Sequence, residues 1–197
     1  MNELLNKFID YQKLVGCKLS YNLSNGQKVE VEFREDNFLH LLGIHKLIDI
    51  NIVQQWLDKS NYKVKNKDVI RFIKSERFND SMVRLSTFFN TIQDRYDSFS
   101  YQNLTTLSYT DAIINFNSSL VNSKLLSDYI LFEKDKNNEY NHMAIAFDKK
   151  TNRRYLESFF HETNDSYLVG QKIVKIDCYH LFDKDGNVIF EDIFNEK

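Results

Sequence analysis

Residues 18–33, KLSYNLSNGQKVEVEF, alternate apolar and polar side chains on both sides of the dipeptide Asn25-Gly26. Successive side chains of a strand point to opposite faces, so this alternation is typical of two half-buried strands. An Asn-Gly pair supplies the positive backbone dihedrals of a tight two-residue turn. The stretch therefore predicts a β-hairpin, the clearest β element of the chain.

Short helices are predicted before and after this hairpin. Residues 2–15 carry apolar side chains near the i, i+3, i+4 spacing, and Gly16 is placed to end that helix. After the hairpin, Asp36 or Asn37 can cap a short helix that Gly43 closes. His40 and His45 would then lie on different sides of a chain reversal.

Two further short helices are predicted over 50–75 and a longer one over 80–99. The longer one has the strongest pattern, because its apolar residues form one stripe at helical spacing. The stripe consists of Met82, Leu85, Phe88, Phe89, Ile92, Tyr96 and Phe99. Arg84 would lie at the edge of that buried face.

The pattern changes after residue 104 to short β-rich runs separated by polar turns such as DKKTN and DKDGN. Neither a linker nor an internal repeat divides the chain. We therefore expect one α+β domain over 1–197, with residues 1–100 mainly helical apart from a hairpin at 18–34, and residues 105–194 mainly antiparallel sheet. The N-terminal helices would pack on the C-terminal sheet.

Composition limits the partners that the protein can have. The 197 residues carry 26 Lys and Arg against 28 Asp and Glu, a net charge of −2, so any nucleic-acid site must be a local patch. No basic segment precedes an apolar run, and no 18 apolar residues occur together, which predicts a cytoplasmic protein without a membrane span. Cys17 and Cys178 are expected to be buried thiols.

Metal and cofactor chemistry is not indicated by any motif. The chain has five histidines, none spaced as in a known metal site: His40, His45, His142, His161 and His180. Phosphate-binding and dinucleotide-binding fingerprints and nucleophile elbows are also missing from the sequence. We expect neither a metal nor a cofactor.

Four motifs, read in order, carry a family resemblance. They are NFLHLLGIHKL at 37–47, MVRLSTFFNTI at 82–92, RRYLESFF at 153–160 and YLVGQKIVKI at 167–176. Together the motifs resemble the fourth of the phage-borne nuclease families grouped by similarity to barnase, EndoU, colicin and RelE toxins. The resemblance implies helices packed on an antiparallel sheet, and cleavage of RNA without a metal.

The resemblance also implies the site residues His40, Arg84, Ser158 with Phe159, and Gln171. His40 would transfer protons, because its ordinary pKa permits both directions near neutrality. Arg84 would hold the phosphate with its planar charged fork. Ser158 and Gln171 would orient the phosphate or the attacking 2′-hydroxyl.

Simpler interpretations stay open beside each of these roles. His40 can be a helix-terminal residue, Arg84 a surface cation, Ser158 an ordinary strand residue, and His45 a packed core histidine. A basic turn could also bind RNA, or be no more than a solvated charged turn. Its residues are Lys149, Lys150, Arg153 and Arg154, followed by Tyr155.

The sequence thus favours a toxin-type endoribonuclease of phage or mobile-element origin that leaves a 2′,3′-cyclic phosphate. The alternative is a non-catalytic protein that uses a nuclease-like fold to bind RNA or a host protein. RNA is the expected substrate, and an antitoxin or host protein is a further candidate partner. The sequence specifies neither the RNA target nor the oligomeric state.

Overall fold

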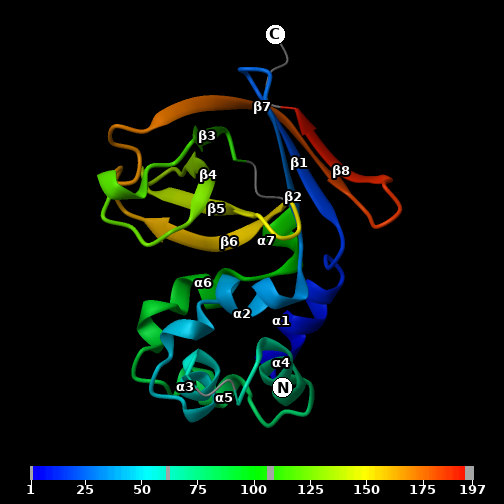
Figure 1. Ribbon diagram of the computed structural model, residues 1–197, viewed down its shortest axis with the longest axis vertical. Helices are drawn as coiled ribbons and strands as arrows, with labels where there is room; N and C mark the ends of the chain where they lie inside the picture. Colours follow the sequence, from blue (N-terminus) through cyan, green and yellow to red (C-terminus); the bar gives the residue numbers. More distant parts are fainter. Residues whose placement is uncertain (1, 61–62, 106–108, 194–197) are drawn as a thin grey trace. The chain divides into compact units, whose positions relative to one another are not determined.

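The computed structural model describes residues 2–60, 63–105 and 109–193, so the ranges 50–75 and 105–194 each include residues outside this description. The chain forms two compact units, and each is built from two stretches of sequence. Met1–Lys13 and Glu35–Leu104 make a helical unit, whereas Leu14–Arg34 and Thr105–Lys197 make a unit of strands. Figure 1 labels the elements of both.

The helical unit consists of short helices. These are α1 (Glu3–Gln12), η1 (Glu35–Asn37), α2 (Phe38–Leu41), η2 (Ile44–Lys46), α3 (Asn51–Leu57), α4 (Asn66–Lys74), α5 (Asp80–Arg84), η3 (Phe89–Thr91), α6 (Gln93–Ser98) and α7 (Tyr101–Thr105), where η marks a 3-10 helix. The predicted helix at the N-terminus is confirmed, although it ends four residues before Gly16. Its cap is Asn2, whose side chain accepts a hydrogen bond from the Leu5 backbone N–H. The two helices predicted over 50–75 are confirmed as α3 and α4.

The single helix predicted over 80–99 is wrong. The chain leaves helical geometry after Arg84, because the Asp49 carboxylate accepts hydrogen bonds from the Thr87 backbone N–H at 2.7 Å and from the Ser86 hydroxyl at 2.5 Å. That N–H is then no longer available to the helical ladder. The apolar stripe is consequently split, with Leu85 83% exposed and Tyr96 fully buried.

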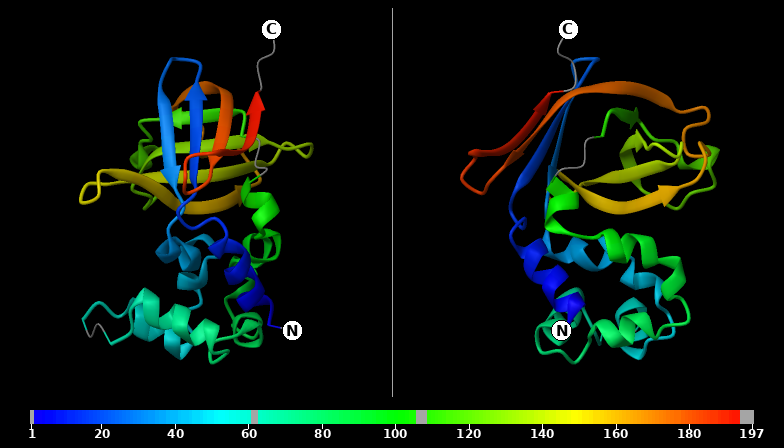
Figure 2. Two further views of the ribbon diagram at one scale, coloured as in Figure 1. Left: turned by 90° about the vertical axis from the view of Figure 1, so that its right-hand side faces the viewer. Right: turned by 180° about the vertical axis from the view of Figure 1, so that it is seen from behind.

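The second unit contains the strands, which form a single sheet. They are β1 (Lys18–Leu23), β2 (Lys28–Glu32), β3 (Asp111–Ile114), β4 (Ser127–Lys134), β5 (Tyr140–Asp148), β6 (Arg153–Glu162), β7 (Lys172–Phe182) and β8 (Val188–Ile193). Their order is β1-β2-β6-β5-β4-β3-β7-β8, and β1 also pairs with β7. The first seven strands of this order therefore close into a barrel, and β8 extends from β7 (Figure 2).

The predicted C-terminal antiparallel sheet is corrected in three respects. The sheet includes the N-terminal hairpin, and it closes because β1 pairs with β2 on one edge and with β7 on the other. It also contains one parallel contact, between β2 and β6, where Glu32 pairs with Tyr155. Closure gives hydrogen-bond partners to edges that an open sheet would expose. The packing of the helices on this barrel stays a prediction.

The hairpin itself is confirmed, but its turn is not the expected two-residue type. The Gly26 backbone N–H donates to the Leu23 carbonyl at 2.8 Å, and the Leu23 N–H donates to the Gln27 carbonyl at 2.9 Å. Gly26 has a positive φ of 83°, whereas Asn25 is absent from the residues with positive φ. This pattern fits a type I turn followed by a left-handed glycine, the usual three-residue loop.

Gly43, in the helical unit, has the most crowded surroundings of the five glycines. Its φ is +78°, and a Cβ added there would lie 2.7 Å from Ile92 Cγ2 and 3.5 Å from Arg95 Cδ. The left-handed backbone and the close approach of residues 92–95 each exclude a side chain. The prediction that Gly43 closes the helix over α2 is confirmed.

We expect Gly43→Ala to lower the free energy of unfolding by about 3 kcal/mol, since left-handed strain and overpacking add. Gly26→Ala is the control, because Gly26 has a similar φ of +83° and no atom within 4 Å of an added Cβ. That variant should lose about 1 kcal/mol, from backbone strain alone. Equal losses in chemical denaturation would contradict the role assigned to the Ile92 contact.

Candidate active site

Two histidines of the first family motif, at 37–47, lie side by side. His40 is on α2 and His45 on η2, and the left-handed Gly43 between them reverses the chain. Their ring centroids are 4.9 Å apart, with an angle of 40° between the ring planes. Both residues are half-buried. The expected chain reversal therefore brings the two imidazoles together instead of separating them.

Two further side chains, which the sequence did not single out, complete this histidine cluster. The Trp56 ring from α3 lies 5.2 Å from the His40 ring. Arg95 from α6 donates a hydrogen bond from Nη1 to the His40 backbone carbonyl at 3.4 Å. Trp56 could have been noticed as the single tryptophan, but Arg95 has no sequence signal that distinguishes it from other helix arginines.

The surroundings of His45 favour its neutral form. Burial is the main cause, and the neighbouring His40, Arg95 and Lys46 add to it, so that the pKa of His45 falls to about 4. Its Nδ1 atom is buried and has no hydrogen-bond partner. A neutral imidazole with an unpartnered nitrogen can accept or donate one more hydrogen bond.

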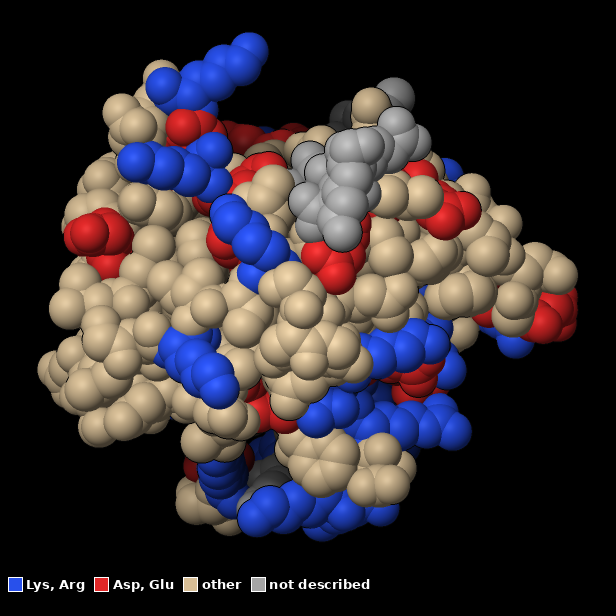
Figure 3. Space-filling view, turned by 90° about the horizontal axis from the view of Figure 1, so that it is seen from above, with Lys and Arg blue, Asp and Glu red and all other residues tan. Residues whose placement is uncertain are grey.

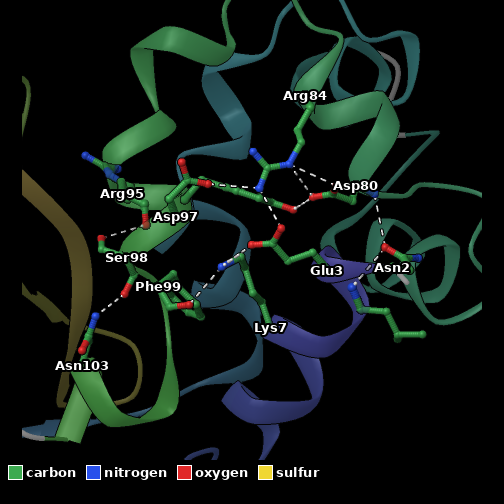
Figure 4. A network of polar contacts seen from close by, with 12 residues as sticks. Asn2, Glu3, Lys7, Asp80, Arg84, Arg95, Asp97, Ser98, Phe99 and Asn103 are labelled. Carbon is green, nitrogen blue, oxygen red and sulfur yellow. Dashed lines mark hydrogen bonds and ion pairs between the residues drawn. The ribbon is translucent and has the colours of Figure 1, made fainter.

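Arg84 lies at the centre of a different network, shown in Figure 4. Its guanidinium contacts Glu3 at 2.7 Å, Asp80 at 3.1 Å and Asp97 at 3.1 Å. Hydrogen bonding to Glu3 is the main reason that the pKa of Arg84 is raised further above its ordinary value. These contacts join α1, α5 and the end of α6. Arg84 thus has the contacts of a structural residue, and its phosphate role stays a prediction.

Ser158 and Gln171 belong to the unit of strands. Ser158 lies on β6 opposite Ala144, and it is half-buried. Gln171 uses both ends of its amide, since Oε1 accepts from the Asn117 N–H at 3.1 Å and Nε2 donates to the Asn117 carbonyl at 3.0 Å. Gln171 therefore ties the start of β7 to the loop after β3, and its predicted substrate contact also stays untested.

The basic turn between β5 and β6 is less basic than its sequence suggests. Arg153 contacts Glu32 at 3.0 Å, and Arg154 contacts Asp128 at 3.1 Å. Lys149 and Lys150 are exposed. Figure 3 shows Lys and Arg interspersed with Asp and Glu on the face that it presents. The turn does not form a continuous cationic surface.

A pocket of about 310 Å³ lies beside this turn. It is lined by Lys18, Glu30, Val31, Glu32, Asn152, Arg153 and Arg154. Tyr155, the aromatic residue expected to contact RNA, is close by on β6 and lies 5.3 Å from the Arg34 guanidinium. Acidic and basic groups thus line the pocket together, so it is suited to a ligand that carries hydrogen-bonding groups as well as charge.

The predicted catalytic residues fall into three places. His40 belongs to the histidine cluster and Arg84 to the ion-pair network, both in the helical unit, whereas Ser158 and Gln171 are in the unit of strands. Their convergence on one phosphate stays a prediction. Across residues 2–60, 63–105 and 109–193, no three His, Cys, Asp or Glu side chains are grouped as metal ligands.

Membership of a nuclease family follows from comparison with known proteins. The chain matches, over residues 3–192, the family described as phage-Barnase-EndoU-ColicinE5/D-RelE like nuclease4. Comparison with curated proteins gives no match, and comparison with solved structures gives none. The protein belongs to this phage-type nuclease family, which confirms the resemblance of the four motifs. Within the described residues, no helix is both long enough and apolar enough to cross a bilayer.

His142 is a buried titratable residue distant in sequence from the histidine cluster. It is fully buried on β5 among the rings of Phe132, Tyr140, Phe160 and Tyr167. Neither ring nitrogen has a hydrogen-bond partner. Burial, followed by the nearby His161, lowers its pKa to about 4.

We expect His142 to account for about 2 kcal/mol of the stability that the wild-type protein loses between pH 8 and pH 5, and His45, whose pKa also falls to about 4, to add a separate loss. The unfolded chain binds a proton near the ordinary pKa of 6.5, whereas the folded chain does so only near 4. This contribution is therefore complete above pH 6.5 and is lost as the pH falls toward 4. His142→Phe should remove the loss due to His142 in denaturation at both pH values, and His161→Gln should retain it.

Proposed function

We propose that this nuclease is a metal-independent endoribonuclease. The observation that carries the proposal is the pairing of His40 and His45, with ring centroids 4.9 Å apart, beside a guanidinium group. Cleavage without a metal needs a base that takes the proton of the attacking 2′-hydroxyl and an acid that protonates the leaving 5′-oxygen, and one imidazole can act as both in turn. It also needs a cation where negative charge develops. This histidine cluster supplies these residue types.

In this proposal His40 carries the main proton transfer. Neutral His40 takes the proton of the 2′-hydroxyl as the 2′-oxygen attacks phosphorus, and the imidazolium so formed gives that proton to the departing 5′-oxygen. The products are a 2′,3′-cyclic phosphate and a 5′-hydroxyl, so no water is needed in this step. His45 is neutral at pH 7, because its pKa is about 4, and it donates or accepts a hydrogen bond. Ser158 and Gln171 are proposed to orient the RNA. Gln171 would do so after its hydrogen bonds to Asn117 break, or through a lone pair of its amide oxygen that Asn117 does not use.

Binding of RNA along the β5–β6 turn is the second part of the proposal. Lys149 and Lys150 are exposed and available to phosphates. Arg153 and Arg154 would contribute by exchanging their carboxylate partners for phosphates, and Tyr155 by stacking on a base. A toxin role, with an antitoxin that covers this surface, belongs to the same proposal.

One observation favours the alternative of a non-catalytic binding protein. Both arginines of the turn are already in ion pairs, and the adjoining pocket carries Glu30 and Glu32. Such a mixed surface suits a protein partner as well as RNA. The two functions differ in one measurable respect, because only the enzyme produces a cyclic phosphate end.

We expect His40→Ala to reduce RNA cleavage by about 10²-fold or more while the protein remains folded. His45→Ala is the comparison variant, and we expect it to act more on the thermal midpoint than His40→Ala does. Cleavage is followed on a labelled RNA in the presence of EDTA, with identification of the cyclic phosphate end. An unchanged rate in His40→Ala would contradict the proposal, as would wild-type activity that EDTA abolishes.

A further inference from the structure

We propose that Arg95, and not Arg84, is the residue that holds the scissile phosphate, in an anion site formed with His45. This inference rests on the proposed ribonuclease function and deepens it by naming the phosphate ligand. It reverses the assignment that the family resemblance implied for Arg84.

The guanidinium of Arg84 already binds carboxylates of the protein itself. Three carboxylates surround its guanidinium, and the adjoining Lys7 contacts Glu3 at 3.0 Å. Two positive charges thus face the three negative charges of Glu3, Asp80 and Asp97. A phosphate placed there would compete with the carboxylates for the same donors and would be repelled by them. Arg84 is therefore poorly suited to hold an RNA phosphate.

Arg95 differs in each of these respects. Its guanidinium donates a hydrogen bond to the His40 carbonyl at 3.4 Å, which leaves most of the guanidinium donors available. It has no carboxylate partner among the described residues, and burial lowers its pKa to about 10. Figure 4 shows the Arg95 side chain directed away from the Arg84 network. A half-buried guanidinium without a bound anion carries an uncompensated charge, which favours binding of an anion there.

His45 provides a second, independent observation. Its Nδ1 is a buried polar atom without a hydrogen-bond partner, which costs free energy unless a ligand satisfies it. The charged or titratable neighbours that act on His45 are all basic, namely His40, Arg95 and Lys46. An anion is the ligand class that would satisfy the nitrogen and lower the repulsion among these groups at once.

The backbone at Gly43 makes this arrangement possible. A Cβ at Gly43 would lie 3.5 Å from Arg95 Cδ, so the stem of Arg95 passes close over the turn that joins the two histidines. The guanidinium reaches the His40 backbone carbonyl from there, and its charge acts on His45. A permanent cation near His40, the proposed proton-transfer group, is suited to stabilise the negative charge that develops on the phosphate during cleavage.

The first experiment measures binding of inorganic phosphate to the whole protein, with the histidine ring signals followed by NMR. In wild-type protein, saturating phosphate should raise the titration midpoint of His45 from about 4, because an anion beside an imidazole favours its charged form. Arg95→Gln should weaken phosphate binding by about 10-fold or more, and Arg95→Lys should recover part of it. No shift at His45, or equal affinity in Arg95→Gln, would overturn the proposal.

Arg84→Gln is the matched control for the same measurement. It is expected to lower the thermal midpoint, because three carboxylates lose their shared partner, and to bind phosphate with the wild-type affinity at a temperature where it is folded. A loss of phosphate binding in folded Arg84→Gln, with none in Arg95→Gln, would overturn the assignment in favour of Arg84.

Cleavage assays on the same variants separate this proposal from the proposed function. With an active wild-type enzyme, Arg95→Gln should lower the rate by about 10²-fold, and Arg95→Lys by less. Wild-type protein that binds phosphate through Arg95 but cleaves no RNA would refute the ribonuclease and support the anion site. Active wild-type protein whose rate is unchanged in Arg95→Gln would refute the anion site and leave the ribonuclease standing.

Discussion

The pairing of β1 on both of its edges is the constraint on which the barrel unit depends. Lys18 pairs with Glu32 of β2 and with Phe182 of β7, so one short strand joins the two ends of an otherwise open sheet. Without it, β2 and β7 would each expose a row of unpaired backbone groups. The inward side chains of β1, among them Leu19 and Tyr21, are buried, which adds apolar contacts to the hydrogen bonds.

The helical unit depends on local charge balance in a comparable way. Two arginines from neighbouring segments, Arg84 and Arg95, have different surroundings, since Arg84 is surrounded by carboxylates and Arg95 is half-buried without a carboxylate partner among the described residues. An arginine of the first kind stabilises a fold. An arginine of the second kind carries a partly buried charge without a partner, and a bound anion would compensate that charge. Family membership identifies a nuclease, but only this difference in surroundings distinguishes the two cations.

Features fixed by neighbouring residues could be predicted from the sequence, and features fixed by distant residues could not. The hairpin over 18–33 and the reversal at Gly43 depend on a few adjacent side chains. The break after Arg84 depends on Asp49, which is 38 positions away from Thr87, so the apolar stripe gave no sign of it. Barrel closure likewise needs β7, and the histidine cluster needs Trp56 and Arg95, which only the folded chain brings near.

The interleaving of the two units along the chain has a consequence for synthesis on the ribosome. The hairpin of β1 and β2 is made before the other strands, yet Lys18 pairs with Phe182 of β7, which follows β3, β4, β5 and β6 along the chain. One edge of the hairpin therefore stays unpaired while those four strands are made, and such long-range pairing forms slowly. The barrel of this nuclease can close only after the ribosome has released β7.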